Sequence, residues 1–193
     1  LRALRYQVNP HFLFNTLNSL SSLVITGRNK EAEAMIMNLS TFFRSSLSGD
    51  PTIDVPLEDE FALQRLYLDI EAIRFPMRLE VQINLPAALR DWPVPGLILQ
   101  PIVENAIKHG VARSTDKVTV TIDAHAMGDQ LVVTIVNDGA TGTTPDGNGS
   151  GIGLSNVRSR LAARFGEAAT MIVDRPDDAH FRVTLTLPRG SHA

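Results

Sequence analysis

The run Gln100-Pro101-Ile102-Val103-Glu104-Asn105-Ala106-Ile107-Lys108-His109-Gly110 has apolar residues at helical spacing with a polar edge beside them. Positions 99, 102, 103, 106 and 107 cover one arc of a helix that advances about 100° per residue, so we expect a helix over about 95–110. Asn105, Lys108 and His109 share the edge outside that arc. An Asn carbonyl oxygen suits Mg²⁺, and Lys108 and His109 could offer positive charge and donors to phosphates. The run therefore predicts a half-buried helix with a phosphate-binding edge, although an ordinary charged surface gives the same pattern.

Apolar and polar residues alternate on both sides of this helix, which is typical of strands with one buried face. The alternation predicts strands over 78–85, 118–124 and 131–135, and two more over 169–174 and 180–187. Helical spacing predicts helices over about 57–75 and 153–165. From residue 78 onward the sequence therefore indicates the α+β class, a sandwich with helices on one face of a mixed sheet.

A glycine-rich segment separates the strand at 131–135 from the helix at 153–165. Six of the thirteen glycines lie between positions 139 and 153. Glycine lets the backbone approach a phosphate closely, and a helix N-terminus offers N–H groups and a positive dipole end. The segment lacks the Gly-Lys-Ser/Thr of a P-loop, and no parallel βαβ unit precedes it. A phosphate-binding loop of another type and a plain connector both stay open.

Two amphipathic helices come before the sandwich. Leu13, Leu17, Leu20 and Val24 fall within about 60° on the first helix, which Gly27 should end. A second stripe contains Met35, Leu39, Phe42, Phe43 and Leu47. The short turn at 27–30 predicts an antiparallel helical hairpin. Two helices bury little surface alone, so we expect a second copy of the chain to complete a four-helix bundle.

His11 points away from the apolar stripe of its own helix. With His11 at 0°, Asn15 lies near 40° and Asn18 near 340°, whereas the stripe is centred close to about 210°. A neutral imidazole nitrogen is a competent nucleophile toward a phosphoryl group that is held in line with it. The alternative is an ordinary surface histidine.

Composition excludes several classes of protein. The net charge of −3 argues against a globally basic nucleic-acid binder, so we expect no direct contact with nucleic acid. No run approaches 18 apolar residues, so we expect no membrane contact by this stretch of chain. The absence of cysteine excludes disulfides and thiolate chemistry. Because the chain opens Leu1-Arg2-Ala3, we expect it to be a piece of a longer protein.

Three segments in this order resemble the sensor histidine kinases of the LytS/AlgZ type. Residues 7–18 are similar to the phosphoacceptor motif of that family, 99–110 to its N box and 149–161 to its second glycine box. The resemblance implies a dimerising helical hairpin followed by a Bergerat-type (GHKL) ATP-binding α/β sandwich with a mixed sheet. The implied divisions are a hairpin over 1–50, a connecting segment and helix over 51–77, an ATP-binding domain over 78–189 and a tail over 190–193.

The same resemblance implies a reaction and partners. It implies ATP-dependent autophosphorylation of His11 and transfer of the phosphoryl group to an aspartate in the receiver domain of a response regulator, often one with a LytTR DNA-binding domain. A homodimer through the hairpin and a cytoplasmic location follow, with the parent protein anchored in the inner membrane by an upstream region. A non-catalytic nucleotide-sensing module that docks partners through its hairpin is the alternative.

Residue roles are carried over by position. His11 would be the phosphoacceptor and Asn105 the Mg²⁺ ligand, while Lys108, His109 and Arg158 would contact phosphates. The nucleotide-binding lid would contain Gly139, Gly149, Gly151, Ile152, Gly153 and Leu154.

One position in the nucleotide site departs from the family pattern. The adenine-binding Asp of the family usually stands two residues before the first glycine of its box, where this chain has Asn137, followed by Asp138. Strand alternation puts Asn137 on the face of Leu131 and Ile135, and its amide could both accept from and donate to an adenine edge. Charge favours Asp138, so both residues are candidates and alternation favours Asn137.

Two further departures bear on mechanism. ATP-hydrolysing relatives of this fold place a general-base Glu where this chain has Pro101, which argues against a water-activating ATPase. Many histidine kinases carry an acidic residue after the phosphoacceptor, where this chain has Phe12, so Glu104 becomes the candidate base. Asn15 matches the position of a phosphatase-assisting amide, which predicts that the protein also dephosphorylates its regulator.

Overall fold

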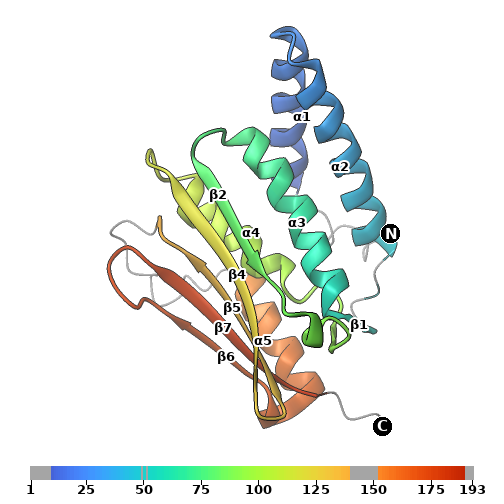
Figure 1. The fold of residues 1–193 in the computed structure, drawn as a ribbon, viewed down its shortest axis with the longest axis vertical. Helices are drawn as coiled ribbons and strands as arrows, with labels where there is room; N and C mark the ends of the chain where they lie inside the picture. The colour runs from blue at the N-terminus through green and yellow to red at the C-terminus, as the bar shows by residue number, and fades with distance from the viewer. Residues whose placement is uncertain (1–9, 49, 51, 140–151, 190–193) are drawn as a thin grey trace.

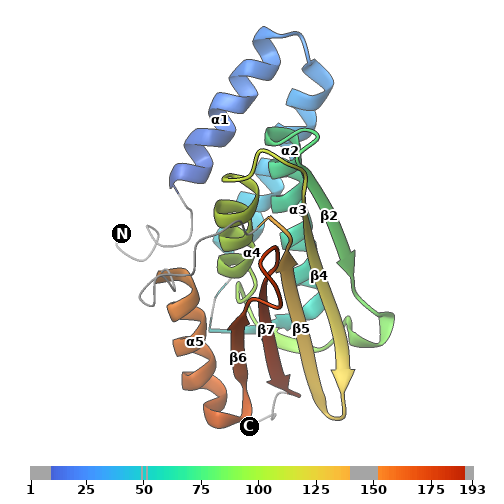
Figure 2. The same ribbon diagram turned by 90° about the vertical axis from the view of Figure 1, so that its left-hand side faces the viewer.

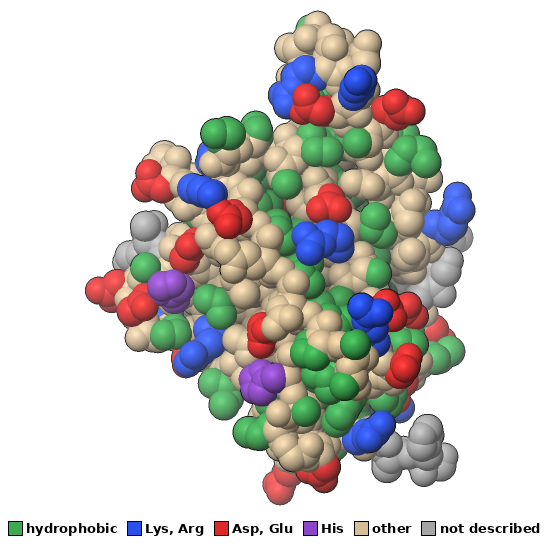
Figure 3. All heavy atoms as spheres, in the orientation of Figure 1, with side chains coloured by type: hydrophobic (Ala, Val, Ile, Leu, Met, Phe, Trp, Pro, Cys, Tyr) green, Lys and Arg blue, Asp and Glu red, His purple; other side chains and the backbone are tan. Residues whose placement is uncertain are grey.

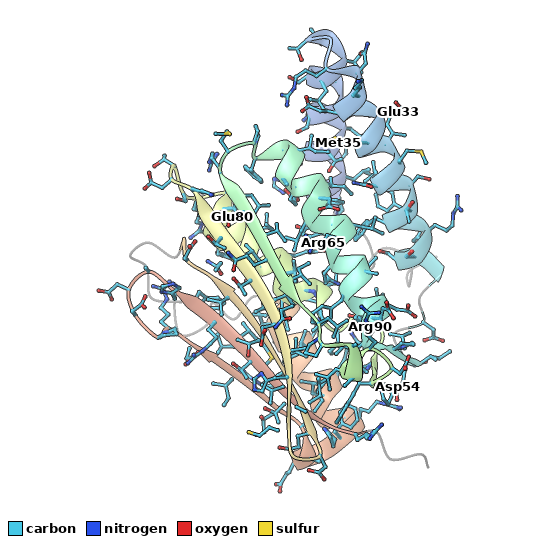
Figure 4. All side chains as sticks on the ribbon, in the orientation of Figure 1. Glu33, Met35, Asp54, Arg65, Glu80 and Arg90 are labelled. Atoms are coloured by element: carbon cyan, nitrogen blue, oxygen red, sulfur yellow. The ribbon has the colours of Figure 1, made fainter. Side chains whose placement is uncertain are left out.

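The computed structural model describes residues 10–48, 50, 52–139 and 152–189 of the 193-residue chain. It contains the predicted helical hairpin, formed by α1 (Pro10–Ile25) and α2 (Asn29–Ser48), which projects beyond the rest of the molecule (Figure 1). Gly27 makes the turn with a φ of +74°, a value that glycine adopts without strain. Met35 is fully buried on α2, on the side that faces α1 (Figure 4).

The buried face of α1 is not the predicted stripe. Within the chain, α1 buries Phe12, Thr16 and Leu23, which lie about 100° around the helix from the stripe centred on Leu17 and Val24. Leu17 stays 46% exposed and Val24 56% exposed. The physical reason is the packing of the hairpin on a third helix, which periodicity in α1 alone does not reveal. The Thr16 hydroxyl donates to the Phe12 carbonyl at 2.8 Å, so this polar side chain is satisfied where it is buried.

The second half of the chain is a five-stranded mixed sheet, as predicted, with the order β2-β4-β5-β7-β6. β2 runs parallel to β4 and the other neighbours are antiparallel. Figure 2 shows α4 and α5 in front of the sheet, and the buried side chains alternate along its strands, as a sheet covered on one face requires. The strands are β2 (Leu79–Asn84), β4 (Val118–Met127), β5 (Gln130–Asn137), β6 (Thr170–Asp174) and β7 (Phe181–Pro188). The helices are α3 (Leu57–Arg74), α4 (Gln100–Ala106) and α5 (Ile152–Phe165), with short turns η2 (Ala87–Leu89), η3 (Ile107–Val111) and η4 (Gly166–Ala168).

The helix predicted over 95–110 is shorter and less regular than expected. A two-stranded ladder of β1 (Asp54–Pro56) and β3 (Pro93–Pro95) takes up its first residues, and the α-helix begins only at Gln100. Residues 107–111 form a π turn, in which the Ala112 N–H donates to the Ile107 carbonyl at 2.9 Å. Such wider turns are rare and often occur at functional sites.

A buried carboxylate fixes the start of α4. Glu60 of α3 is 2% exposed and accepts hydrogen bonds from the backbone N–H groups of Leu97 and Leu99. Arg160 of α5 donates to the Gly96 and Leu97 carbonyls at 2.6 and 3.2 Å. Leu97 has a φ of 59°, a left-handed conformation that costs a non-glycine residue free energy and persists only when its surroundings hold it. The turn before α4 is therefore held by α3 and α5 together.

Charges of both signs are interspersed over the face of the molecule shown in Figure 3. Among the described helices, none combines the length and the apolar character needed to cross a bilayer.

A candidate functional cleft between the hairpin and the sheet half

A cleft of about 200 Å³ lies where α1, α3, α4 with η3 and the start of α5 meet. Its lining includes His11 and Asn15 from α1, Arg74 from α3, Asn105 and Lys108 from α4 and η3, and Leu154 from α5. Residues almost 100 positions apart in the chain therefore share one enclosure. Residues of all three predicted motifs meet here: His11, Asn105, and Gly153 with Leu154.

His11 lies in the first turn of α1 with its side chain exposed. The Asn15 amide nitrogen lies 3.1 Å from the imidazole Nδ1 and 3.1 Å from Nε2. This contact places Asn15 on the helix face that the spacing of four residues predicted. Asn15 can therefore orient the ring that would carry the phosphoryl group.

Phe12 holds this end of α1 against the rest of the molecule. Its ring is 4% exposed and lies 5.0 Å from the ring of Tyr67 on α3 and 5.5 Å from the ring of Phe42 on α2, measured between centroids. Aromatic pairs at such distances stabilise beyond their buried area. Phe12 thus acts as an anchor that positions His11 at the cleft.

The wall between His11 and α4 comes from α3, which the sequence did not place at the site. Tyr67, Glu71 and Arg74 line the cleft. Glu71 is 1% exposed, and both of its carboxylate oxygens lie 2.6 Å from Nη1 of Arg74. Burial raises the pKa of Glu71, and the neighbouring Arg74 charge opposes that rise. Burial also raises the pKa of the Tyr67 phenol well above its usual range, so this hydroxyl stays protonated.

A sequence signal for this wall does exist. Polar residues recur every three or four positions along one side of α3, at Glu60, Gln64, Tyr67, Glu71 and Arg74. All but Arg74 are buried. When polar residues recur on the buried side of a helix, they are usually buried and hydrogen-bonded rather than exposed to solvent. Such a pattern indicates a polar surface inside the protein.

On α4 and η3, Asn105 is half-buried, whereas Lys108 and His109 are exposed at the mouth of the cleft. The π turn carries Lys108 and His109 and sets their direction relative to Asn105. Partial burial and the positive charges of Arg113 and Lys108 lower the pKa of His109. The lowered pKa favours the uncharged imidazole, which has one N–H donor, over the positive charge expected from the sequence. Glu104 also lines the cleft, with its Oε1 accepting from the Gln100 amide at 2.9 Å.

Asn137 and Asp138 have different surroundings. Asn137 is 2% exposed, and its Nδ2 lies 2.5 Å from the point that a Cβ on Gly110 would occupy. Asp138 accepts from the Thr119 N–H at 2.6 Å and so extends the β4–β5 pairing. Of the two candidates for adenine binding, only Asn137 faces inward beneath η3.

The structure describes only some of the predicted lid residues. Gly149 and Gly151 lie outside the described residues. Gly153 and Leu154 line the cleft, and a Cβ on Gly153 would lie 3.4 Å from the Pro101 Cβ. Ile152 is 81% exposed at the start of α5. Two other predicted residues do not line the cleft: Gly139, which is packed against Val118, and Arg158, which is exposed on α5.

The donor set of the cleft fits Mg²⁺ only together with phosphates. Within the described ranges, no group of three or more His, Asp or Glu side chains could hold a metal ion. Mg²⁺ commonly binds through one or two protein oxygens plus water and substrate phosphates, and the Asn105 amide oxygen at the cleft can serve as such a ligand.

Two family profiles match the sequence. The family described as "Histidine kinase" matches residues 1–79, and "Histidine kinase-, DNA gyrase B-, and HSP90-like ATPase" matches residues 95–191. The sensor histidine kinase BtsS of Escherichia coli strain K12 is 42% identical over 188 residues, which are 97% of this chain and 33% of that protein. The sensor histidine kinase/phosphatase LytS of Staphylococcus aureus strain Mu50 is 32% identical over 183 residues, 89% of this chain and 31% of the relative.

The chain thus spans about a third of the length of these relatives. Among solved structures, the histidine kinase domain of the Erythrobacter litoralis EL346 blue-light activated kinase superimposes with a TM-score of 0.56. The superposition covers 94% of this chain and 96% of that domain at 16% sequence identity, which shows a shared fold.

Proposed function

The chain belongs to the histidine kinases, its second half to the histidine kinase-, DNA gyrase B-, and HSP90-like ATPase family, and on that premise we propose that it transfers the γ-phosphoryl group of ATP to His11. The observation that carries this proposal is the shared cleft. His11 of the hairpin and Asn105 of α4 line the same enclosure of one chain, with Lys108 beside them. A nucleophile and a phosphate-binding edge in one cleft are the two parts that phosphoryl transfer needs.

The proposed chemistry uses one nitrogen of the neutral imidazole as the nucleophile. The N–P bond forms as the bond from the γ-phosphorus to the ADP oxygen breaks, and the proton on the other ring nitrogen must leave. Glu104 lines the cleft and is the proposed acceptor of that proton. Asn15 holds the ring, and Lys108 and His109 donate to phosphate oxygens. Mg²⁺, when bound with the nucleotide through Asn105, supplies charge neutralisation for the phosphates.

The remaining nucleotide contacts are proposed by position. Asn137 would read the adenine, since its buried amide lies beneath η3. Arg158 and the glycine-rich segment before α5 would cover the phosphates. The proposal for Arg158 rests on its position in the motif, because Arg158 lies outside the cleft.

For partners and location, we propose a homodimer through the hairpin and a response regulator as phosphoryl acceptor. Apolar side chains on α1 and α2 support the dimer, since Leu17, Val24, Ile36 and Leu47 are each between 46% and 56% exposed in the single chain. Such a surface calls for a partner helix pair. A LytTR-type regulator, a cytoplasmic position for this chain and an anchored parent protein complete the proposal, supported by the sensor kinases that it resembles.

Labelling with γ-labelled ATP and Mg²⁺ tests the proposed function. We expect phosphate on the chain that is lost in acid and stable in base, as a phosphoramidate is. If ATP binds by calorimetry and no label transfers, the nucleotide-sensing module is the better description.

Autophosphorylation is expected to occur within one subunit, because His11 and Asn105 of the same chain share the cleft. A tagged wild-type chain is mixed with an untagged Asn105→Ala chain at a concentration where light scattering shows dimers. Label is expected on the wild-type chain alone. Label on the Asn105→Ala chain would show that the cleft of one subunit serves the His11 of the other.

Asn15→Ala is expected to separate kinase from phosphatase activity. The amide that contacts His11 can also orient a water molecule against an aspartyl phosphate, so its loss should slow regulator dephosphorylation by at least about tenfold. Self-labelling should change by less than about threefold, because the nucleophile remains. Asn18→Ala, an exposed amide one turn further along α1, is the matched control. The measurement is decay of a receiver domain that has first been labelled by the wild-type chain, and unchanged decay rules out the role of Asn15.

A further inference from the structure

We propose that Arg74 is a phosphate-binding residue of this site, contacting the γ-phosphoryl group between the nucleotide and His11. The assignment rests on the proposed function and adds to it a residue from α3. Its basis is the position of Arg74 in the cleft, the way Glu71 holds it and the donors that this arrangement leaves.

Position is the first argument. α3 forms the wall of the cleft between α1, which carries His11, and α4, which carries Asn105, and Arg74 lies in its last turn. His11, Arg74 and Asn105 all line this one cleft. The Arg74 side chain is only 12% exposed, and it is one of the residues that line the cleft.

Orientation is the second argument. Both oxygens of Glu71 contact the single nitrogen Nη1 of Arg74 at 2.6 Å, and the guanidinium carbon lies 5.1 Å from the centroid of the Phe75 ring. These contacts fix the plane of the guanidinium group before any ligand arrives. The other three N–H donors are on Nε and Nη2, and we find no acceptor for them among the residues that the structure describes. They are therefore available to a ligand in the cleft.

Chemistry is the third argument. Arginine presents planar, always charged donors that match phosphate oxygens in pairs. In phosphoryl transfer, charge is spread over the three equatorial oxygens of the moving group, and a positioned arginine is a strong stabiliser of that charge. The other cationic side chain in the cleft, Lys108, is exposed at its mouth. Arg74 is thus the preoriented cation between donor and acceptor.

A purely structural ion pair is the competing explanation, since a buried carboxylate needs a partner. The two explanations differ in what they predict for nucleotides. A γ-phosphate contact makes Arg74 matter for a triphosphate and not for a diphosphate. An ion pair that only holds α3 in place affects both nucleotides equally or neither of them.

The test measures binding of Mg²⁺–ADP and of the non-hydrolysable β,γ-imido analogue of ATP to the whole chain by calorimetry. Arg74→Met is expected to weaken the triphosphate analogue by about 10- to 100-fold while ADP changes by less than about twofold. His11 labelling should fall by about 10² to 10³-fold. Arg74→Lys should recover part of both losses. Arg65→Met, an exposed arginine on the same helix (Figure 4), is the matched control and should change neither nucleotide.

A second variant serves as the control for a loss of folding. If Arg74→Met leaves Glu71 without its partner and the chain unfolds, Glu71→Gln combined with Arg74→Met removes the buried charge, and the same ratio of affinities is measured. Equal losses for both nucleotides, or no loss, overturn the assignment of Arg74. A wild-type chain that binds the triphosphate but acquires no label would instead contradict the proposed function, and the ratio of affinities would still decide the role of Arg74.

Discussion

His11→Gln is expected to leave no acid-labile phosphate on the chain while ATP binding stays within about twofold of the wild-type value. Glutamine keeps a polar side chain of similar length, but its amide nitrogen has no lone pair available for attack on phosphorus. The side chain is exposed, so the substitution should change stability by no more than about 0.5 kcal/mol. The neighbouring Phe12, which anchors α1 on Tyr67 and Phe42, is untouched.

The measurement pairs labelling with calorimetry on the same preparation. His125→Gln is the matched control, because His125 is an exposed histidine on β4 outside the cleft and should retain full labelling. Label that persists in His11→Gln would show another acceptor, and His109, which lines the same cleft, would be the next position to replace.

Asn105→Ala is expected to lower labelling by at least about 100-fold through loss of the magnesium-bound nucleotide. Asn105 is half-buried at the cleft and offers the amide oxygen best placed for Mg²⁺. Alanine is a better helix former than asparagine by a few tenths of a kcal/mol, so α4 should persist. The effect is therefore on the ligand and not on the fold.

The informative measurement is nucleotide affinity with and without Mg²⁺. The wild-type chain should bind ATP more tightly when Mg²⁺ is present, and Asn105→Ala should lose that difference. Asn29→Ala, an exposed asparagine at the start of α2 and outside the cleft, should keep it. A variant that loses labelling but keeps the Mg²⁺ effect would move the metal ligand to another residue.

The parts of the fold that sequence predicted well are those whose pattern is local. Alternation along β4, β5 and β7 marks the buried face of the sheet without reference to other elements. The start of α4 was predicted too early because it depends on Glu60, whose carboxylate takes the N–H groups of Leu97 and Leu99 from 37 and 39 residues away. The β1–β3 ladder is short and rich in proline, which carries no strand signal in a sequence.

The candidate site likewise contains residues whose position follows from a local pattern and residues whose position depends on distant elements. Periodicity on single helices placed His11 with Asn15 and Asn105 with Lys108, and the structure brings the two pairs into one cleft. Glu71 and Arg74 stand three residues apart on α3, a spacing at which exposed ion pairs also form. Their burial comes from the hairpin on one side of α3 and the sheet half on the other, which no window of sequence contains.

The turn held between Glu60 and Arg160 also bears on how such proteins can be recombined. α3 supplies the carboxylate that positions α4, and β1 completes the ladder with β3. In a chimera, residues 54–74 and the sheet half should therefore come from the same parent protein. A chimera joined after α3 would separate a strained turn from its brace, whereas a joint at the end of α2 keeps Glu60, Arg160 and the β1–β3 ladder in one parent. We therefore expect hairpins from different relatives to be exchanged most safely at the end of α2, provided that each graft brings an aromatic residue to meet Tyr67.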